Sequence, residues 1–372
     1  MKNSIFLLPP KARPYRIHWD ITHSCNFLCN HCASDAVCSG TIDDLSAKEI
    51  YKIVNNLRSE RPFDITFFGG EPLIRDDIID LIDLVKAQLD TCGISIVTNG
   101  SLLKQFGLDL LQRGVNISVS LDGTSANEND PIRGAGTFRE IVENITWLIN
   151  EKYSHSIITG NVNISFTLSS LFNSPEKLII FAENIGINGI SIGSIMELGR
   201  ALQNAWLVPS DKQLIKFIED MIIASKETEV EIRMNLYKPL FTKYINYKYG
   251  LNLPYKYYGC GIVNSDFAIR PNGSVVLCQG AYPGTRICTE LNIPILNLVE
   301  YHIEEILGHD AFKKIDELRN PGRYHAYIPC NECEFAGSYC DPCWINAFFS
   351  EKTQHSLCLY AKEQLEVLTN AR

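Results

Sequence analysis

Three cysteines lie close together near the start of the chain, as Cys25-Asn-Phe-Leu-Cys29-Asn-His-Cys32. Thiolates at this spacing can hold one iron–sulfur cluster, which normally takes four cysteine ligands. A loop that supplies only three would leave one iron open to a non-protein ligand, as catalytic metal sites keep one position open. Zinc is the alternative, with Cys38 or His31 as a fourth ligand.

Further residues with useful chemistry follow the predicted strands: Gly69-Gly70-Glu71-Pro72, Asn99, Ser120, Asp122 and Arg133. Glycines after a strand can expose backbone groups to a ligand because no Cβ intervenes. Glu71 could bind an ammonium group or brace its loop, and Arg133 suits a carboxylate through its bidentate fork. Taken singly, Asp122-Gly123 could be an ordinary turn and Arg133 a solvated surface charge.

The elements that must position these residues alternate between strand and helix. Strands are predicted over 15–21, 64–68, 94–98, 116–121, 162–167 and 189–195, with helices between them. Ser46 with Glu49, and Thr137 with Glu140, are predicted capping boxes at two helix starts. Six strand–helix units indicate an α/β fold with a parallel sheet, and the candidate residues cluster where such strands end.

Composition limits the class of protein. The chain has 372 residues, 45% of them hydrophobic, and a formal net charge of −9 with both signs interspersed, which argues against nucleic-acid binding. We find neither a signal peptide nor an apolar run long enough for a membrane span, so we expect a cytoplasmic protein. Its 13 cysteines are then expected to bind metal rather than to form disulfides.

A second set of cysteines occupies the C-terminal part of the chain. Its members are Cys260, Cys278, Cys330, Cys333, Cys340, Cys343 and Cys358. The last five include a C-x2-C-x6-C-x2-C run, which also fits paired zinc ribbons. Cys38 and Cys92 fit neither set and are predicted to be buried thiols that behave as small apolar residues.

Over roughly residues 15–200 the chain resembles the radical S-adenosylmethionine (SAM) superfamily, whose hallmark is the spacing of Cys25, Cys29 and Cys32. The resemblance implies a partial (β/α)6 TIM-like barrel and a catalytic [4Fe–4S] cluster that binds SAM at its open iron. His31 would then lie near the adenine, Ser120 would bind the ribose and Arg133 the carboxylate. Gly69, Gly70, Glu71, Pro72, Asn99 and Asp122 match the family's other cofactor-binding segments.

The C-terminal cysteines resemble the SPASM domain, which holds two auxiliary [4Fe–4S] clusters. By position, the first would take Cys260, Cys278 and Cys343, with Cys288 a possible fourth ligand. The second would take Cys330, Cys333, Cys340 and Cys358. The family pattern is C-x2-C-x5-C-x3-C, so Cys340 stands one position late here.

The resulting domain prediction has four parts. An extension covers 1–14, the barrel 15–228, a tyrosine-rich linker 229–258 and the auxiliary-cluster domain 259–372. The linker rings could alternatively form a wall facing the substrate.

By resemblance, the activity is reductive cleavage of SAM to a 5′-deoxyadenosyl radical that abstracts a substrate hydrogen. A ribosomally synthesised peptide is the favoured substrate, because the chain is similar to the mycofactocin and pyrroloquinoline-quinone maturases. Such an oxidoreductase would need a reductant such as flavodoxin or ferredoxin, and a separate leader-peptide-binding protein. A sugar or aminocyclitol is the alternative substrate. Sulfatase maturation ranks lower because Gln279 stands where that group has a carboxylate base.

Overall fold

The architecture comes from a computed structural model. It describes residues 16–38, 44–60, 62–90, 92–234, 236, 238–255, 266–276, 289, 292–310, 329–336, 338–340 and 356–370. Cys260, Cys278, Cys288 and Cys343, together with Gln279 and the extension 1–14, lie outside the described residues. The predictions made for them stay predictions.

One sheet of ten strands forms the centre of the described part, in the order β10-β9-β8-β1-β2-β3-β4-β5-β6-β7. Strands β1 to β7 run parallel, and β8 joins the other side of β1, also in parallel. Strands β9 and β10 are antiparallel additions. Their bounds are β1 Arg16–Thr22, β2 Asp64–Gly69, β3 Gly93–Thr98, β4 Asn116–Ser120, β5 Val162–Leu168, β6 Gly189–Ser194, β7 Glu231–Met234, β8 Asp266–Ile269, β9 Ser274–Val276 and β10 Leu296–Asn297.

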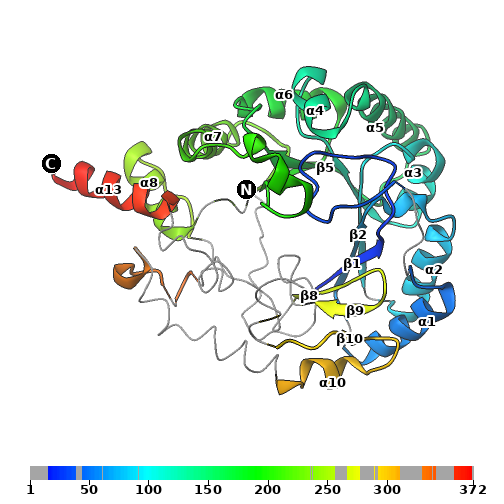
Figure 1. The fold of residues 1–372 in the computed structure, drawn as a ribbon. Coiled ribbons are helices and arrows are strands. Elements are labelled where there is room, and N and C mark those ends of the chain that lie inside the picture. Colours follow the sequence, from blue (N-terminus) through cyan, green and yellow to red (C-terminus); the bar gives the residue numbers. More distant parts are fainter. Residues whose placement is uncertain are drawn as a thin grey trace.

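The sheet curls, and helices α1 to α6 cover its outer face (Figure 1). The helices are α1 Ala47–Asn56, α2 Ile78–Gln88, α3 Leu103–Gln112, α4 Ala126–Arg133, α5 Thr137–Ser154, α6 Pro175–Ile185, α7 Asp211–Ala224, α8 Pro239–Tyr249, α10 Ile303–Leu307 and α13 Ser356–Asn370. All six predicted strands are present within two residues of their predicted ends. The α/β class is confirmed.

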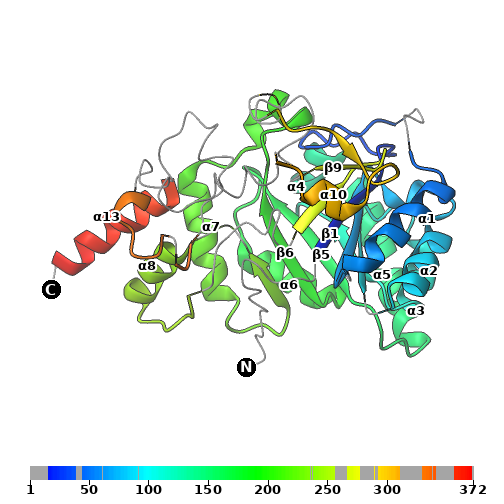
Figure 2. The ribbon, with the colours of Figure 1, turned by 90° about the horizontal axis from the view of Figure 1, so that it is seen from below.

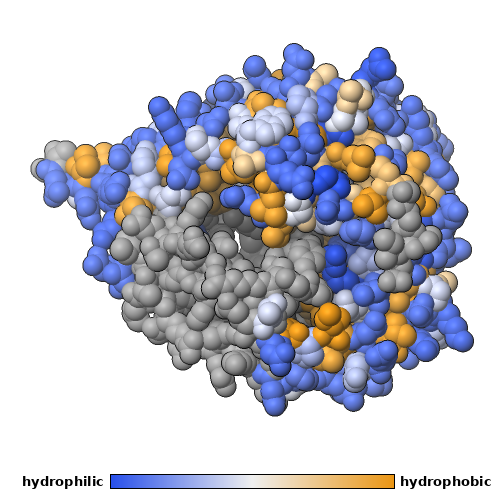
Figure 3. Space-filling view, in the orientation of Figure 1, coloured by the Kyte–Doolittle hydropathy of each residue, from blue (hydrophilic) through white to orange (hydrophobic). Residues whose placement is uncertain are grey.

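Strand alternation separates two environments. Ile17, Trp19 and Ile21 of β1 are buried in the core between sheet and helices. The intervening residues of the strand point to the opposite face, as the two-residue period of a strand requires. Hydrophilic side chains cover most of the coloured surface in Figure 3. None of the described helices is both long and apolar enough to cross a membrane.

One of the two predicted capping boxes is correct. Ser46 and Glu49 form the reciprocal pair at the start of α1. The box predicted at Thr137 is wrong, because the Asp130 carboxylate accepts hydrogen bonds from Phe138 N (2.8 Å) and Gly136 N (2.7 Å). A carboxylate from the preceding helix therefore satisfies the first amides of α5.

The predicted linker contains regular structure. β7 pairs with β6, and α8 packs beside α13 at the end of the molecule opposite α1 to α3 (Figure 2). Tyr244 is buried there, and its hydroxyl donates to Glu219 Oε1 of α7 at 2.6 Å. β8, which belongs to the predicted auxiliary domain, pairs with β1. The predicted division at residue 258 therefore separates strands that share one sheet.

Candidate functional site

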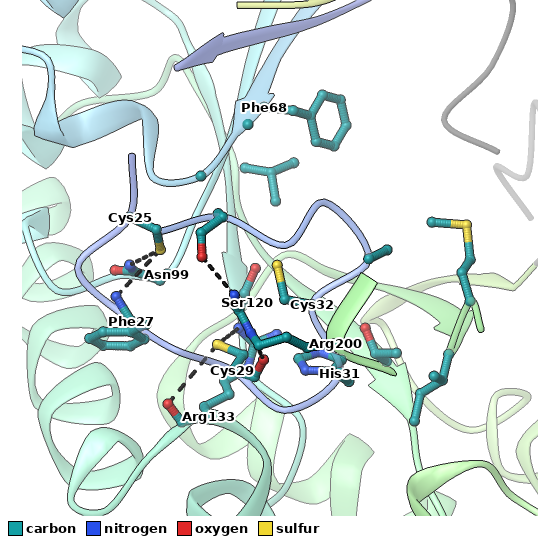
Figure 4. A pocket seen from close by; sticks show the side chains of 18 of the residues that line it. Cys25, Phe27, Cys29, His31, Cys32, Phe68, Asn99, Ser120, Arg133 and Arg200 are labelled. Carbon is teal, nitrogen blue, oxygen red and sulfur yellow. Dashed lines mark hydrogen bonds between the residues drawn. The ribbon is translucent and has the colours of Figure 1, made fainter. Parts of the chain in front are cut away.

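The loop after β1 places its three cysteines around one cavity. Cys25, Cys29 and Cys32 all line a space of about 240 Å³, shown in Figure 4. Backbone hydrogen bonds shape the loop, from Cys25 N to Val37 O (2.9 Å) and from Cys32 N to Cys29 O (3.2 Å). Among the described residues, no three Cys, His, Asp or Glu side chains are grouped so as to hold a single metal ion.

The carboxyl ends of β2 to β6 supply much of the remaining lining. The residues are Phe68, Gly69, Gly70, Val97, Thr98, Asn99, Ser120, Thr167 and Ser194. Parallel strands end at one edge of their sheet, so segments far apart in the sequence meet there. Of the predicted cofactor residues, His31, Gly69, Gly70, Asn99, Ser120 and Arg133 line the cavity, whereas Glu71, Pro72 and Asp122 do not.

The two glycines after β2 are required by the chain itself. A Cβ on Gly69 would lie 2.2 Å from Thr22 O, and one on Gly70 would lie 2.0 Å from Ser24 O. Gly70 N donates to Thr22 O, and Glu71 N donates to Ser24 O, both at 2.8 Å. The glycines therefore let this loop dock against the start of the cysteine loop, besides lining the cavity.

Glu71 braces the loops and does not face the cavity. It is fully buried, and its carboxylate accepts hydrogen bonds from Thr98 Oγ1 (2.7 Å), Asn99 N (2.6 Å) and Leu73 N (3.1 Å). Burial raises the pKa of this carboxyl to about 7, against the opposing effect of the hydrogen bonds. Of the two roles predicted for Glu71, the contacts favour bracing.

Asp122 contacts two cavity-lining residues but does not line the cavity itself. It is fully buried, and its Oδ2 lies 2.6 Å from Arg133 Nε and 3.1 Å from His31 Nε2. Burial alone would raise the pKa of Asp122, but the Arg133 guanidinium and His31 hold it well below its usual range. His31 Nδ1 is buried without a hydrogen-bond partner among the described residues.

The thiols are in contrasting electrostatic surroundings. Burial raises the pKa of Cys25 to about 11. Burial also raises the pKa of Cys29, but Arg133 opposes this, with its Nη1 at 4.0 Å from the sulfur. Thiolates at these positions are therefore costly unless a cation or a metal cluster compensates them.

Arg200, which was not predicted from the sequence, also lines the cavity. Its Nε donates to Cys29 O at 3.0 Å, and its backbone N donates to Cys32 O at 3.0 Å. The available signal was Gly199-Arg200 shortly after a strand whose end joins the same edge of the sheet as the other motifs.

A second group of four cysteines meets in the C-terminal part. Cys330, Cys333, Cys340 and Cys358 line one small cavity, together with Lys238 and apolar residues. Cys358 is on α13, far in sequence from the other three. Burial raises the pKa of Cys340 to about 12 and that of Cys358 to about 11. The four thiols predicted to share a site are therefore adjacent.

Two other cysteines differ from expectation. Cys38 is exposed and Cys92 is half-buried, so the prediction of two buried apolar thiols is wrong for Cys38. Cys38 does not line the cavity, and His31 faces Asp122 through Nε2. Cys38 is therefore not placed as the fourth zinc ligand considered from the sequence.

Two family models match segments that contain cysteines from both groups. Residues 19–164 match the family model of the Radical SAM superfamily, and residues 260–334 match that of SPASM, an iron–sulfur cluster-binding domain. This chain carries a radical SAM domain and a SPASM domain. The iron–sulfur and SAM-binding character implied by these two domains fits the cysteines that surround the two cavities.

Curated relatives align with different shares of the chain. Mycofactocin maturase MftC of Mycobacterium ulcerans is 34% identical over 129 residues, which are 34% of this chain and 34% of that protein. The chain therefore spans about a third of the length of that relative. The AdoMet-dependent heme synthase of Oleidesulfovibrio alaskensis is 24% identical over 358 residues, 92% of this chain and 87% of that protein.

Solved structures share the fold. SuiB of Streptococcus suis bound to S-adenosylmethionine superposes with a TM-score of 0.67 at 16% identity, covering 93% of this chain and 77% of SuiB. anSMEcpe with bound AdoMet gives a TM-score of 0.69 at 14% identity, covering 96% and 100%. The radical SAM domain is therefore the partial TIM-like barrel that the family resemblance implied.

Proposed function

We propose that this chain cleaves SAM at a [4Fe–4S] cluster held by Cys25, Cys29 and Cys32, and so abstracts a hydrogen atom from a peptide substrate. One observation carries the proposal: three thiols from one loop share a cavity with the carboxyl ends of five parallel strands. When bound and reduced, the cluster supplies the electron that splits the C5′–S bond of SAM into methionine and a 5′-deoxyadenosyl radical.

The residues around the cavity fit such a group. Three thiols leave one metal position for SAM, by the logic of open catalytic sites. The Arg133 guanidinium would balance thiolate charge at Cys29 and could bind the SAM carboxylate. Ser120 offers a hydroxyl to the ribose, and the unpaired Nδ1 of His31 is available to the adenine. Asp122 would orient Arg133 and His31 without touching SAM.

The C-terminal cysteines would hold the auxiliary clusters. The adjacent thiols of Cys330, Cys333, Cys340 and Cys358 are a complete set of four for one cluster. A second auxiliary cluster would use Cys260, Cys278 and Cys343. These clusters could accept the unpaired electron of the substrate radical, which would complete a two-electron oxidation of the substrate and make the net chemistry that of an oxidoreductase.

A ribosomally synthesised peptide is the favoured substrate. The support is the similarity to mycofactocin maturases and to the fold of SuiB, one structure of which is bound to its precursor peptide SuiA. A separate leader-binding protein and a flavodoxin- or ferredoxin-type reductant would then be partners. A small molecule is the second candidate, because the AdoMet-dependent heme synthases align with nearly the whole chain.

The test is anaerobic reconstitution with iron and sulfide, reduction with dithionite, and chromatography of the products formed from SAM. We expect 5′-deoxyadenosine, and its absence from cluster-loaded protein would refute the proposal. For the substrate, candidate precursor peptides and porphyrin-type compounds are each added with SAM deuterated at C5′. If only the small molecule speeds up 5′-deoxyadenosine formation and changes in mass, the peptide is rejected as the substrate.

A further inference from the structure

A short segment after β6 packs against the cysteine loop. It comprises the 3-10 helix η3, Gly199–Gln203, and the following Asn204. We propose that Arg200 is a positioning residue, which fixes the cysteine loop in the shape that holds the cluster and leaves one metal position toward SAM. This inference rests on the proposed function of the loop.

Arg200 binds the backbone of two of the three cysteine residues. Its side-chain Nε donates to Cys29 O, and its own backbone N donates to Cys32 O, each at 3.0 Å. A cysteine sulfur is placed by its backbone and one rotatable side-chain bond, so fixing these carbonyls fixes where the sulfurs can lie. Figure 4 shows Arg200 beside Cys32 and His31 at the cavity wall.

The same guanidinium also holds the part of the loop that follows the cysteines. Its Nη1 donates to Ala36 O and to Asp35 Oδ1, both at 2.8 Å. Asp35 has a left-handed backbone with φ of 52°, which is uncommon outside glycine. One planar side chain therefore ties Cys29 to a turn several residues later, with contacts that a lysine ammonium could not reproduce together.

The neighbouring residues allow this close approach. Gly199 has a φ of +54°, and a Cβ there would lie 2.6 Å from Cys32 O and 2.7 Å from Ala33 O. Asn204 Nδ2 donates to Asn30 O at 3.1 Å, which adds a contact to the loop at a residue between the second and third cysteines. The segment therefore donates hydrogen bonds to five residues of the loop, and Arg200 makes four of these bonds.

The experiment compares Arg200→Met and Arg200→Lys with Arg233→Met. Arg233 is a half-exposed arginine on β7 that pairs with Glu231. Iron per chain and the change in the electron paramagnetic resonance spectrum on adding SAM are measured after anaerobic reconstitution. For Arg200→Met we expect loss of about four iron atoms per chain, one cluster's worth, and loss of the SAM-induced spectral change.

The rate of 5′-deoxyadenosine formation should fall at least about a hundredfold in Arg200→Met, because chains without this cluster cannot cleave SAM and a small misplacement in chains that keep it already has an effect of that size. Arg200→Lys should retain only part of the iron and of the spectral change. Arg233→Met should match the unaltered chain in every measurement.

An Arg200→Met protein with full iron and an unaltered response to SAM would overturn the inference. If that variant does not fold, Asn204→Ala and Gly199→Ala decide: selective loss of the SAM-responsive cluster supports the inference, and full retention rejects it. Failure of the proposed function looks different, because the unaltered chain itself would then form no 5′-deoxyadenosine.

Discussion

The two cysteine-lined cavities differ in size and in lining. The N-terminal cavity measures about 240 Å³ and brings three thiols together with Asn99, Ser120 and Arg133. The C-terminal cavity measures about 10 Å³ and brings four thiols together with apolar residues such as Leu240 and Phe335. Three thiols in a larger space that also holds polar side chains suit a group that must accept another ligand, whereas four in a small apolar space suit a group that needs none.

The two cavities also differ in how the chain assembles them. Short loops at the carboxyl ends of five strands surround the first, and Glu71 and Asp122 brace those loops from buried positions. The second depends on α13, which packs on α8 through Tyr244 and Tyr360. The first site is thus part of the barrel, and the second is held by a helix from the end of the chain.

The largest expected effect separates the two cavities directly. Cys29→Ala should abolish 5′-deoxyadenosine formation, because the open site loses one of its three ligands. Cys340→Ala, the matched change in the other cavity, should lower iron content by a similar amount and still cleave SAM. Iron analysis and product chromatography measure both. Equal loss of 5′-deoxyadenosine in the two variants would break the distinction between an open and a closed site.

A smaller effect concerns the charges behind the open cavity. Asp122→Ala leaves the buried guanidinium of Arg133 without its carboxylate, so we expect a loss of roughly 3–5 kcal/mol in the free energy of unfolding. Asp83→Ala is the control. Asp83 pairs with Arg113 at the surface at 2.8 Å, and its loss should cost less than about 1 kcal/mol. Urea titrations of the cluster-free proteins measure both. Similar losses in the two variants would mean that Asp122 does not compensate a buried charge.

The smallest expected effect concerns the contact between β1 and the turn between β8 and β9, where the barrel and the predicted auxiliary domain share one sheet. Arg270, from the turn between β8 and β9, places Nη1 2.6 Å from Asp20 Oδ2 of β1. Burial raises the pKa of Asp20 from 3.8 to about 6, although Arg270 opposes the shift. The folded chain therefore holds this proton more tightly than the unfolded chain. The stabilisation that comes from protonated Asp20 is fully present below pH 3.8 and is lost as the pH rises through about 6.

Asp20→Asn removes this titration. The melting temperature of Asp20→Asn minus that of the unaltered chain should therefore be more positive at pH 7.5 than at pH 5. Calorimetry at the two pH values measures the difference. A difference that is constant with pH would show that Asp20 does not titrate in this range.

The sequence by itself determined the parts that depend on local pattern. The spacing of Cys25, Cys29 and Cys32 needs only one loop, and β-branched runs bounded by glycine or asparagine define the six strands. The resemblance to the SPASM domain likewise implied that Cys330, Cys333, Cys340 and Cys358 share a site, and the structure places these four thiols around one cavity. Ser46 caps α1 as predicted because a capping box spans four residues.

Only the tertiary structure decided which residues face the cavity and which support it. Glu71 and Asp122 belong to the same motifs as the cavity residues, yet they are buried behind it because their partners come from other strands and loops. Arg200 reaches Cys29 across 171 positions of sequence. The strand β7 within the predicted linker, and the pairing of β8 with β1, likewise depend on partners distant in the chain. Periodicity indicates how apolar and polar residues alternate within each segment. Long-range hydrogen bonds and charge pairs form only when the sheet brings different segments together.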